Sequence, residues 1–514
     1  MNGAESLVRT LIASEVKVCF TNPGTSEMHF VAALDKIDGM RCVLGLFEGV
    51  VTGAADGYFR MTGKPASTLL HLGPGLGNGL ANLHNAKKAR SGIVNIVGEH
   101  ARDHIKYDAP LTADIEGIAR PMSHWVKTSP SSKDIAADGA LAVEAARAAP
   151  GQIATLILPA DTAWNEGAAP ATARAPQPRA RVSPDAVRAA AAALRQPHAA
   201  LMLGGIGVRN PAMEWAGRIA AKTGCRLLGE FNSARIERGA GRVVSQRVPY
   251  VVDLALKTLG ELQQLVLVGG KVPVSFFAYP DKPSVLMPAG CAVTQLAGID
   301  EDMVAALEVL ADELGACTTA PAHVATLNPP ALPTGKVTLD GIAAVLGALI
   351  PENGIVVDEA VSSGRGFAPA TTHAQPHDWL TTMGGAIGFG LPTAVGAAIG
   401  APGRKVISLE GDGSAMYTLQ ALWTMAREQL DVTVVIFANR SYNILRGELA
   451  AVGAGTPGQR ATDMLTLDRP NLDWVAMARG HGVDAGQAST LDELAVQLKR
   501  GLATSGPYLI ELVF

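Results

Sequence analysis

The stretch that decides the fold is Lys405–Tyr442, K-V-I-S-L-E-G-D-G-S-A-M-Y-T-L-Q-A-L-W-T-M-A-R-E-Q-L-D-V-T-V-V-I-F-A-N-R-S-Y. Val406–Leu409 is a short apolar run that ends at Glu410-Gly-Asp-Gly, and Ala415–Glu428 then carries apolar residues at helical spacing without Gly or Pro. Val432–Phe437 is rich in β-branched residues and long enough only for a buried strand. The stretch therefore predicts a strand, a glycine turn, a helix and a second, parallel strand reached by a right-handed crossover.

Asp412 and Asn439 fall just past the carboxyl ends of these two strands, where open α/β sheets bind ligands. A carboxylate, an amide oxygen and backbone carbonyls form the kind of oxygen site that Mg²⁺ prefers, completed by phosphate oxygens and water. Gly411 and Gly413 would let backbone N–H groups approach a phosphate, and Ser414 opens the predicted helix, whose N-terminus favours an anion. Taken alone, G-D-G is an ordinary turn, but its context predicts a magnesium-held phosphate.

The composition describes a globular chain of several domains. At 514 residues the chain is too long for one core and suits about three domains. Only 18% of residues are charged and the net charge is −4, so neither nucleic acid nor a membrane surface is an expected partner. The five cysteines include no C-x-x-C pair, no long apolar span is uninterrupted, and the N-terminus lacks the apolar core of a signal peptide. We expect a cytoplasmic protein.

Short apolar runs alternate with helical patterns along the whole chain, which is typical of doubly wound α/β proteins. In the first part, Ala66–His71 is an expected strand, and Gly73–Gly79 after it is an expected glycine-dense turn before a helix. The strands expected in the middle part are Ala199–Leu203, Cys225–Leu228, Leu265–Val268 and Ser284–Met287.

Two proline-rich segments, residues 165–182 and 318–335, are predicted to be linkers. The sequence therefore predicts three doubly wound parallel-sheet domains, at residues 1–164, 183–317 and 336–514.

Gly411-Asp412-Gly413 followed by Asn439 resembles the metal and diphosphate motif of thiamine-diphosphate enzymes, in the branch that holds acetolactate synthase, pyruvate oxidase and benzoylformate decarboxylase. The resemblance spans the chain in the order pyrimidine-binding, middle and diphosphate-binding domain. It implies that thiamine diphosphate and Mg²⁺ are the cofactors and that the backbone carbonyl of Ser441 is the third protein ligand of the metal, with Tyr442 beside the cofactor. The family motif usually ends in two asparagines, whereas this chain has Ala438-Asn439, which removes one supporting hydrogen bond.

The resemblance also assigns residues that hold and activate the cofactor. Glu48 matches the glutamate whose carboxylic acid hydrogen-bonds the aminopyrimidine ring and switches on the thiazolium carbon. Gly385 should present its carbonyl to the exocyclic amine, and Ile387 should wedge beneath the bent cofactor. Ser362 and Ser363 are expected to anchor the diphosphate from the opposite wall.

On the substrate side, Thr25 and His71 match the positions of the active-site serine and the first histidine of benzoylformate decarboxylase. His71 could donate to an oxyanion or relay a proton. Ile444 and Leu445 are expected to line the substrate pocket. The decarboxylase carries a second catalytic histidine where this chain has Ala278, and the loss of that proton donor favours carboligation over protonation.

We therefore expect an enzyme that decarboxylates a 2-keto acid and then joins the product to a second carbonyl compound, as acetolactate synthase does. Simple decarboxylation, as by benzoylformate decarboxylase, is the alternative, and a non-catalytic binding or regulatory subunit is an alternative of another class. The family implies a homodimer as the minimal unit and a homotetramer as the expected assembly. FAD is possible as a further cofactor, but the flavin-contact motifs of full-length acetolactate synthases are not evident, so it is not supported.

Overall fold

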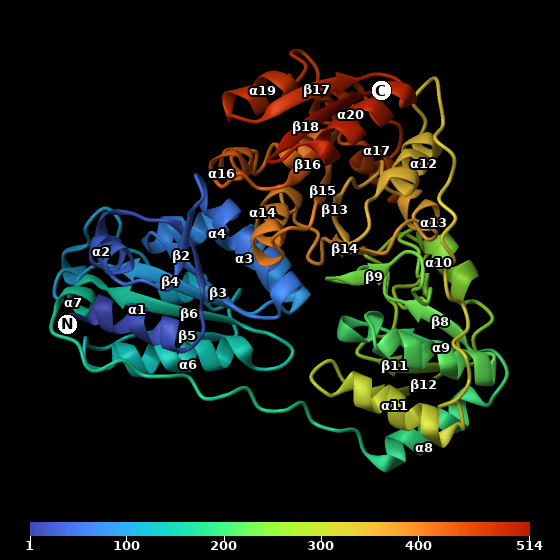
Figure 1. Cartoon of the computed structure of the whole chain (residues 1–514), viewed down its shortest axis with the longest axis horizontal. Coiled ribbons are helices and arrows are strands. Elements are labelled where there is room, and N and C mark those ends of the chain that lie inside the picture. Colours follow the sequence, from blue (N-terminus) through green and yellow to red (C-terminus); the bar gives the residue numbers. More distant parts are fainter.

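The computed structural model describes all residues, 1–514, and contains three sheets, one in each of three lobes (Figure 1). Their strand orders are β2-β1-β3-β4-β6-β5, β10-β8-β7-β11-β12 and β17-β18-β16-β15-β13-β14-β9. Every pairing is parallel except that of β14 with β9. The expected class, three parallel-sheet α/β domains, is confirmed.

The first lobe holds β1 (Val18–Asn22), β2 (Arg41–Leu44), β3 (Ala66–Leu70), β4 (Ile93–Glu99), β5 (Trp125–Thr128) and β6 (Ile153–Pro159). Its helices are α1 (Gly3–Ala13), α2 (Met28–Lys36), α3 (Glu48–Thr62), α4 (Leu72–Ala89), α5 (Ile115–Ala119), α6 (Ile135–Arg147) and α7 (Ala160–Trp164), with 3-10 turns η1 (Thr25–Glu27) and η2 (Ile105–Tyr107). The turn expected at Gly73–Gly79 is wrong, because this segment forms the first turns of α4. Its glycines let α4 lie close to its neighbours: a Cβ added at Gly79 would be 2.9 Å from Thr52.

The middle lobe holds β7 (Ala199–Leu203), β8 (Arg226–Gly229), β10 (Gln246–Arg247), β11 (Gln264–Val268) and β12 (Ala292–Ala297). Its helices are α8 (Pro184–Leu194), α9 (Ala212–Thr223), α10 (Val252–Leu259) and α11 (Met303–Glu313), with the 3-10 turn η3 (Gly205–Val208). The strand expected at Ser284–Met287 is wrong, because the segment makes only an isolated bridge between Val285 and Val274. Pro283 and Pro288 flank it and limit its pairing.

The third lobe holds β13 (Gly354–Glu359), β14 (His377–Thr381), β15 (Val406–Gly411), β16 (Val432–Ala438), β17 (Asp484–Ala488) and β18 (Tyr508–Val513), joined at its edge by β9 (Ile236–Arg238). Its helices are α12 (Leu339–Leu349), α13 (Phe367–Ala370), α14 (Gly390–Gly400), α15 (Asp412–Ala415), α16 (Ala421–Arg427), α17 (Asn443–Ala451), α18 (Gln459–Met464), α19 (Trp474–Gly480) and α20 (Leu491–Ala503).

The parallel pair predicted from the Lys405–Tyr442 stretch is present as β15 and β16. The single helix expected at Ala415–Glu428 is wrong, because it is split into α15 and α16. The residues between them turn toward another loop: the Thr418 hydroxyl donates to the Gly388 carbonyl, at 3.0 Å. This tertiary hydrogen bond competes with a continuous helix.

Helices α3 and α14 pack side by side and join the first lobe to the third (Figure 1). The contact depends on glycine: a Cβ added at Gly57 would lie 2.2 Å from the Thr393 carbonyl oxygen, and one at Gly396 would lie 1.9 Å from that of Ala54. A hydrophobic cluster of 44 buried residues runs through both helices into the first and third sheets. The two lobes therefore share one core.

Residues 165–182 and 318–335 contain no helix or sheet strand, and in Figure 1 both run along the outside of the molecule. The boundaries proposed for the three domains stay predictions. No helix combines the length and hydropathy that a membrane crossing requires.

Candidate active site

Asp412 follows β15 and begins α15, at the carboxyl edge of the third sheet. Its carboxylate accepts the N–H of Gly413 at 2.9 Å and the N–H of Arg440 at 2.7 Å. The residue is only 3% exposed, and burial raises the pKa of its carboxyl to about 6. The hydrogen bond to Arg440 brings the loop after β16 against Asp412, so the structure joins the two strand ends.

Residues 439–442 form this loop and are held from both sides. Asn439 Oδ1 accepts the N–H of Ser441 at 3.0 Å. The segment Leu465–Leu467 pairs with the loop through two backbone hydrogen bonds, of 3.0 Å to Tyr442 and 2.7 Å to Arg440. Arg440 has a φ of 55°, in the left-handed region that residues with side chains rarely adopt. The loop is thus kept in a strained conformation by its neighbours.

The donor atoms of this loop fit a hard divalent cation. Asp412 supplies a carboxylate, Asn439 an amide oxygen, and the Ser441 carbonyl accepts no hydrogen bond. A Cβ added at Gly413 would lie 2.5 Å from the Tyr442 ring, so only glycine allows this close approach. The chain has no group of three or more His, Cys, Asp or Glu side chains that could hold a metal ion, so a cation at this loop would depend on amide and backbone oxygens beside the one carboxylate.

A cavity of about 620 Å³ opens beside the loop of residues 439–442. Polar and charged groups form its lining, which comprises Asn439, Arg440, Ser441, Arg446, Thr466, Asp468, Arg469, Pro470 and Asn471. Three arginines against one carboxylate suit an anionic group.

Ser362 and Ser363 lie in the turn after β13, the strand that pairs with β15, and Ser414 lies in α15. Ser363 and Ser414 are buried and Ser362 is half-buried. Val361 has a φ of 49°, an outlier for a β-branched residue. The helix dipole expected behind Ser414 is small, because α15 has only 4 residues. Any phosphate here must rely on hydroxyl and backbone N–H donors.

Gly385 and Ile387 lie in the loop between β14 and α14, and three side chains of α4 hold this loop. His84 Nε2 lies 3.1 Å from the Gly384 carbonyl, and Asn85 bonds both the N–H and the carbonyl of Ala386, at 3.2 and 2.9 Å. Asn82 Nδ2 donates to the Gly388 carbonyl at 3.0 Å. Gly385 itself is exposed with a φ of 78°.

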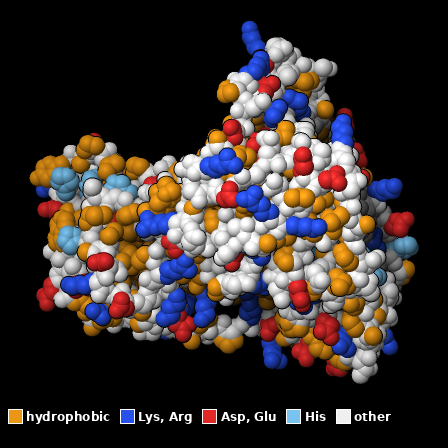
Figure 2. Space-filling view, turned by 45° about the horizontal axis from the view of Figure 1, so that its top comes forward, with side chains coloured by type: hydrophobic (Ala, Val, Ile, Leu, Met, Phe, Trp, Pro, Cys, Tyr) orange, Lys and Arg blue, Asp and Glu red, His pale blue; other side chains and the backbone are white.

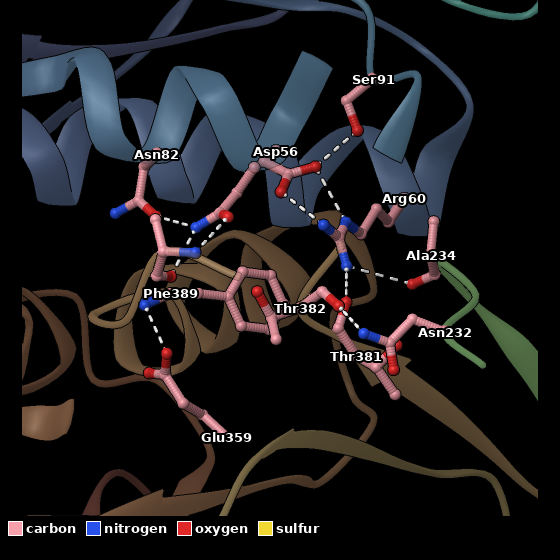
Figure 3. A network of polar contacts seen from close by, with 12 residues as sticks. Asp56, Arg60, Asn82, Ser91, Asn232, Ala234, Glu359, Thr381, Thr382 and Phe389 are labelled. Carbon is pink, nitrogen blue, oxygen red and sulfur yellow. Dashed lines mark hydrogen bonds and ion pairs between the residues drawn. The ribbon is translucent and has the colours of Figure 1, made fainter. Parts of the chain in front are cut away.

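Buried charges fix both ends of this loop (Figure 3). Beyond it, the Glu359 carboxylate accepts the N–H groups of residues 389 and 390 at 3.1 and 2.8 Å, and burial raises the pKa of Glu359 to about 7. Before it, Arg60 donates to the Thr381 carbonyl at 2.7 Å and pairs with Asp56 through two hydrogen bonds of 2.8 and 2.7 Å. The backbone around Gly385 is therefore rigidly positioned.

The middle lobe reaches this loop through Phe276. A Cβ added at Gly385 would lie 2.8 Å from the ring. Phe276 belongs to an aromatic cluster with Phe231, Tyr250 and Phe277. Ala278, two residues later, is exposed and carries no group that could donate a proton.

Glu48 is the first residue of α3, at the carboxyl edge of the first sheet. Its carboxylate accepts a hydrogen bond of 3.0 Å from Asn78, and a Cβ added at Gly75 would lie 3.2 Å from it. Asn82, one helical turn further along α4, donates to the Gly49 carbonyl at 2.8 Å. The start of α3 is therefore fixed against α4.

His71 caps α4 at the same sheet edge, and its partner is Glu27, a residue that the sequence reasoning missed. His71 Nδ1 lies 2.9 Å from the buried Glu27 carboxylate, which also accepts the Gly24 N–H at 2.7 Å. Ser26 Oγ lies 3.4 Å from the same ring nitrogen, whereas Thr25, the expected site residue, is exposed. Because Nδ1 is engaged, Nε2 is the ring nitrogen that stays available.

Ile444 and Leu445 lie on α17, which has no buried residue; Ile444 is half-buried and Leu445 exposed. The Glu448 carboxylate on the same helix accepts the hydroxyls of Tyr250 and Tyr279 at 2.8 and 2.9 Å. Helix α17 is therefore attached to the middle lobe near Phe276.

The predicted site residues form two groups within one chain. Glu48 and His71 lie at the edge of the first sheet, and Asp412, Asn439, Ser441 and the serines lie at the edge of the third. No hydrogen bond or ion pair joins Glu48 to Asp412 or to residues 439–442.

A second cavity, of about 970 Å³, lies between the first and middle lobes. Its basic lining residues include Lys64, Lys88, Arg90, Arg147, Arg179, Arg209, Arg235 and Lys271. Arg209 Nε is buried without a partner, and burial lowers the pKa of Arg209 to about 10. This basic lining suits an anionic ligand.

Family models match both ends of the chain. Residues 1–122 match the thiamine pyrophosphate enzyme N-terminal TPP binding domain, and residues 362–512 match the C-terminal TPP binding domain.

Individual relatives match over nearly the whole length. A Mycobacterium tuberculosis protein provisionally named acetolactate synthase large subunit IlvX is 52% identical, over 100% of this chain and 99% of its own. Benzoylformate decarboxylase from Pseudomonas aeruginosa is 30% identical, over 96% of this chain and 95% of its own. Among solved structures, a thiamine diphosphate-dependent 4-hydroxybenzoylformate decarboxylase from Rhodococcus jostii superposes with a TM-score of 0.88 at 26% identity, covering 100% of this chain and 99% of its own.

Proposed function

The chain belongs to the thiamine pyrophosphate enzyme family, and from this premise we propose that it uses thiamine diphosphate and Mg²⁺ to decarboxylate a 2-keto acid and to join the remaining acyl unit to a second carbonyl compound. Membership of the acetolactate synthase and decarboxylase branch supports a 2-keto acid as the substrate. The observation that carries the proposal is the buried Asp412 carboxylate, held by the loop that brings Asn439 and Ser441 beside it.

The third lobe would hold the cofactor. Asp412, Asn439 and the Ser441 carbonyl would coordinate Mg²⁺, and Ser362, Ser363 and Ser414 would donate to the diphosphate. Gly385 would present its carbonyl to the aminopyrimidine, and Ile387 would support the ring system. When bound, thiamine diphosphate supplies the nucleophilic carbon that adds to a 2-keto group and holds the electron pair released with carbon dioxide.

The first lobe would supply the groups that transfer protons. Glu48, oriented by Asn78, would share a proton with the pyrimidine nitrogen opposite the amino group. His71 would present Nε2 to the substrate, and the Glu27 carboxylate at Nδ1 would stabilise the protonated ring.

Ala278 supports ligation as the second half of the reaction. At residue 278 this loop offers a methyl group in place of a proton donor, so a second carbonyl compound competes better with a proton for the reacting carbon. The alternative, release of an aldehyde after simple decarboxylation, is favoured by the Glu27–His71 pair, which can deliver a proton.

We propose a homodimer as the minimal unit, with a homotetramer as the expected assembly. Glu48 and Asp412 must reach one cofactor, yet they lie in separate groups of a single chain, so a second copy would complete each site.

The five cysteines are all free, which supports a reducing compartment such as the cytoplasm.

The test is incubation of the purified protein with thiamine diphosphate, Mg²⁺ and either pyruvate or benzoylformate, with products identified by mass. A hydroxyketone is the expected product. If an aldehyde is the only product, the reaction is simple decarboxylation and not ligation. Bound cofactor without carbon dioxide release from any acid in a panel of 2-keto acids would instead identify a binding or regulatory subunit.

A further inference from the structure

Arg60 is a buried arginine near the end of α3. It differs from the Lys and Arg side chains that stand out on the surface in Figure 2, because its own side chain is only 1% exposed. The buried Asp56 carboxylate, one helical turn earlier, accepts two hydrogen bonds from it and a third from the Ser91 hydroxyl. Taking an ion pair out of water costs free energy, so the remaining contacts of Arg60 indicate what the pair does.

The guanidinium contacts both ends of the β14–α14 loop, residues 382–389 (Figure 3). Its Nη1 donates to the carbonyl of Thr381, the last residue of β14, at 2.7 Å. Its central carbon lies 4.7 Å from the ring centroid of Phe389, the last residue before α14. A single side chain therefore joins the residue that precedes the β14–α14 loop to the residue that ends it.

The segment between β8 and β9 supports the start of the same loop. Asn232 Nδ2 donates to the Thr382 carbonyl at 2.7 Å, and the Thr381 hydroxyl donates to the Ser233 carbonyl at 2.9 Å. Arg60 Nη1 also donates to the Ala234 carbonyl in this segment, at 3.2 Å. Helix α3, the segment after β8 and the β14–α14 loop therefore meet at one guanidinium.

The contacts of Arg60 require the planar fork of an arginine. One edge of the fork serves the two carboxylate oxygens of Asp56, and the remaining amino group serves the carbonyls of Ala234 and Thr381. A lysine ammonium is a single point charge and cannot reproduce this arrangement. None of these partners belongs to the loop of residues 439–442, so Arg60 acts on the opposite side of the proposed cofactor site.

We propose that Arg60, assisted by Asn232, positions the Gly385 carbonyl to accept the exocyclic amine of thiamine diphosphate, without contributing to the binding of the metal and the diphosphate. This inference rests on the proposed function. Gly385 lies between the two loop ends that Arg60 joins, and its φ is 78°. A hydrogen bond weakens steeply when its geometry is poor, so a shift of the loop weakens the bond to the amine. Arg60 touches neither cofactor nor substrate and is a positioning residue.

The first experiment needs no cofactor. In the full-length protein, backbone hydrogen exchange followed by mass spectrometry should be about tenfold faster for residues 382–389 in Arg60→Lys than in the wild type. Residues 439–442 should exchange at the wild-type rate. Asn232→Ala leaves the buried ion pair intact and should raise exchange in the β14–α14 loop by about threefold, which keeps the test decisive if Arg60→Lys does not fold. Unchanged exchange in this loop would overturn the proposal.

The second experiment compares the binding of two compounds by calorimetry in the presence of Mg²⁺. One is thiamine diphosphate, and the other is its analogue that carries hydrogen in place of the exocyclic amine. The preference of the wild type for thiamine diphosphate should fall by about tenfold in Arg60→Lys and by less in Asn232→Ala, while the affinity for the analogue stays at the wild-type level.

The matched control is Arg404→Lys. Arg404 also pairs with an aspartate, Asp378, and donates to two backbone carbonyls, but it contacts no residue of the β14–α14 loop. This variant should keep the wild-type preference. Equal losses of affinity for both compounds in Arg60→Lys would make Arg60 an ordinary structural residue and overturn the proposal. A wild type that binds neither compound would overturn the proposed function instead, and the exchange measurement would still decide whether Arg60 holds the loop.

Discussion

The carboxylate of Glu27 lies 2.9 Å from Nδ1 of His71 and is fully buried beneath it. Replacing Glu27 by Gln keeps the size of the side chain and removes the charge that stabilises a protonated ring. We expect the rate of product formation from a 2-keto acid to fall by about 100-fold with cofactor affinity unchanged, measured by steady-state kinetics and cofactor titration. The exposed Glu15→Gln should behave as wild type, and equal rates in the two variants would remove Glu27 from the mechanism.

Glu48→Gln should separate cofactor binding from cofactor activation. The amide can still face Asn78, but it offers no acidic proton to the pyrimidine ring. We expect thiamine diphosphate to bind with near wild-type affinity while hydrogen exchange at the thiazolium carbon, followed by NMR, is lost. Exchange at the wild-type rate would mean that another group activates the cofactor.

Asp412→Asn should abolish stabilisation by the cofactor. For the wild type, thiamine diphosphate and Mg²⁺ at about 100 times their dissociation constant should stabilise the fold by about 2.7 kcal/mol, and EDTA should reverse the rise in melting temperature. The variant should show no rise. Asp484→Asn removes an exposed ion pair with Arg500, outside the cavity, and serves as the control. A full cofactor response in Asp412→Asn would place the metal elsewhere.

Two glycine substitutions, one in the contact of α3 with α14 and one in open space on α4, should have opposite effects on stability. Gly396→Ala would place a methyl group 1.9 Å from the Ala54 carbonyl oxygen, and we expect a loss of about 3 kcal/mol in unfolding free energy. Gly77→Ala, in α4, meets nothing within 4 Å and should stabilise the fold by about 1 kcal/mol. Denaturant unfolding measures both. Equal stability of the two variants would contradict the close approach of the helices.

Glu230 should make stability depend on pH. Burial raises the pKa of its carboxyl from 4.5 to about 6, so the folded state binds the proton more tightly than the unfolded state. Its contribution is present below pH 4.5 and is lost as the pH rises to about 6 and beyond. Relative to Glu230→Gln, the wild type should lose about 2 kcal/mol between pH 4 and pH 7, measured by urea unfolding. Parallel pH profiles would show that Glu230 does not titrate in this window.

Much of the fold could be predicted because many of the buried parallel strands, such as β7, β11 and β16, are short apolar runs. The approach of Asp412 to the loop after β16 could be predicted as well, since Gly411, Asp412 and Asn439 stand at two strand ends, whereas the metal itself stays a prediction. The split of the helix after Asp412 was not visible: it depends on Thr418 reaching the Gly388 carbonyl, a contact between distant parts of the chain. The pairing of β9 with the third sheet is equally non-local.

Glu27 escaped notice for a similar reason. It stands two residues after Thr25 at a helix start, where an acidic residue is ordinary. Glu27 is distinguished by two contacts: its carboxylate occupies the space that a side chain at residue 98 would fill, and it lies against the His71 ring. Neither Gly98 nor His71 is near Glu27 in sequence. The available signal was the glycine near the end of the buried strand β4, which marks a close approach of another group.

The side-chain nitrogen of Asn82 holds two backbone carbonyls at once, that of Gly49 at 2.8 Å and that of Gly388 at 3.0 Å. One carbonyl follows Glu48 and the other follows Ile387. In a dimer where these two residues of one chain serve different cofactors, any shift of the backbone at one reaction centre pulls on the other through a single amide. The two centres of such a dimer would not turn over independently, and occupancy of the first would be felt at the second.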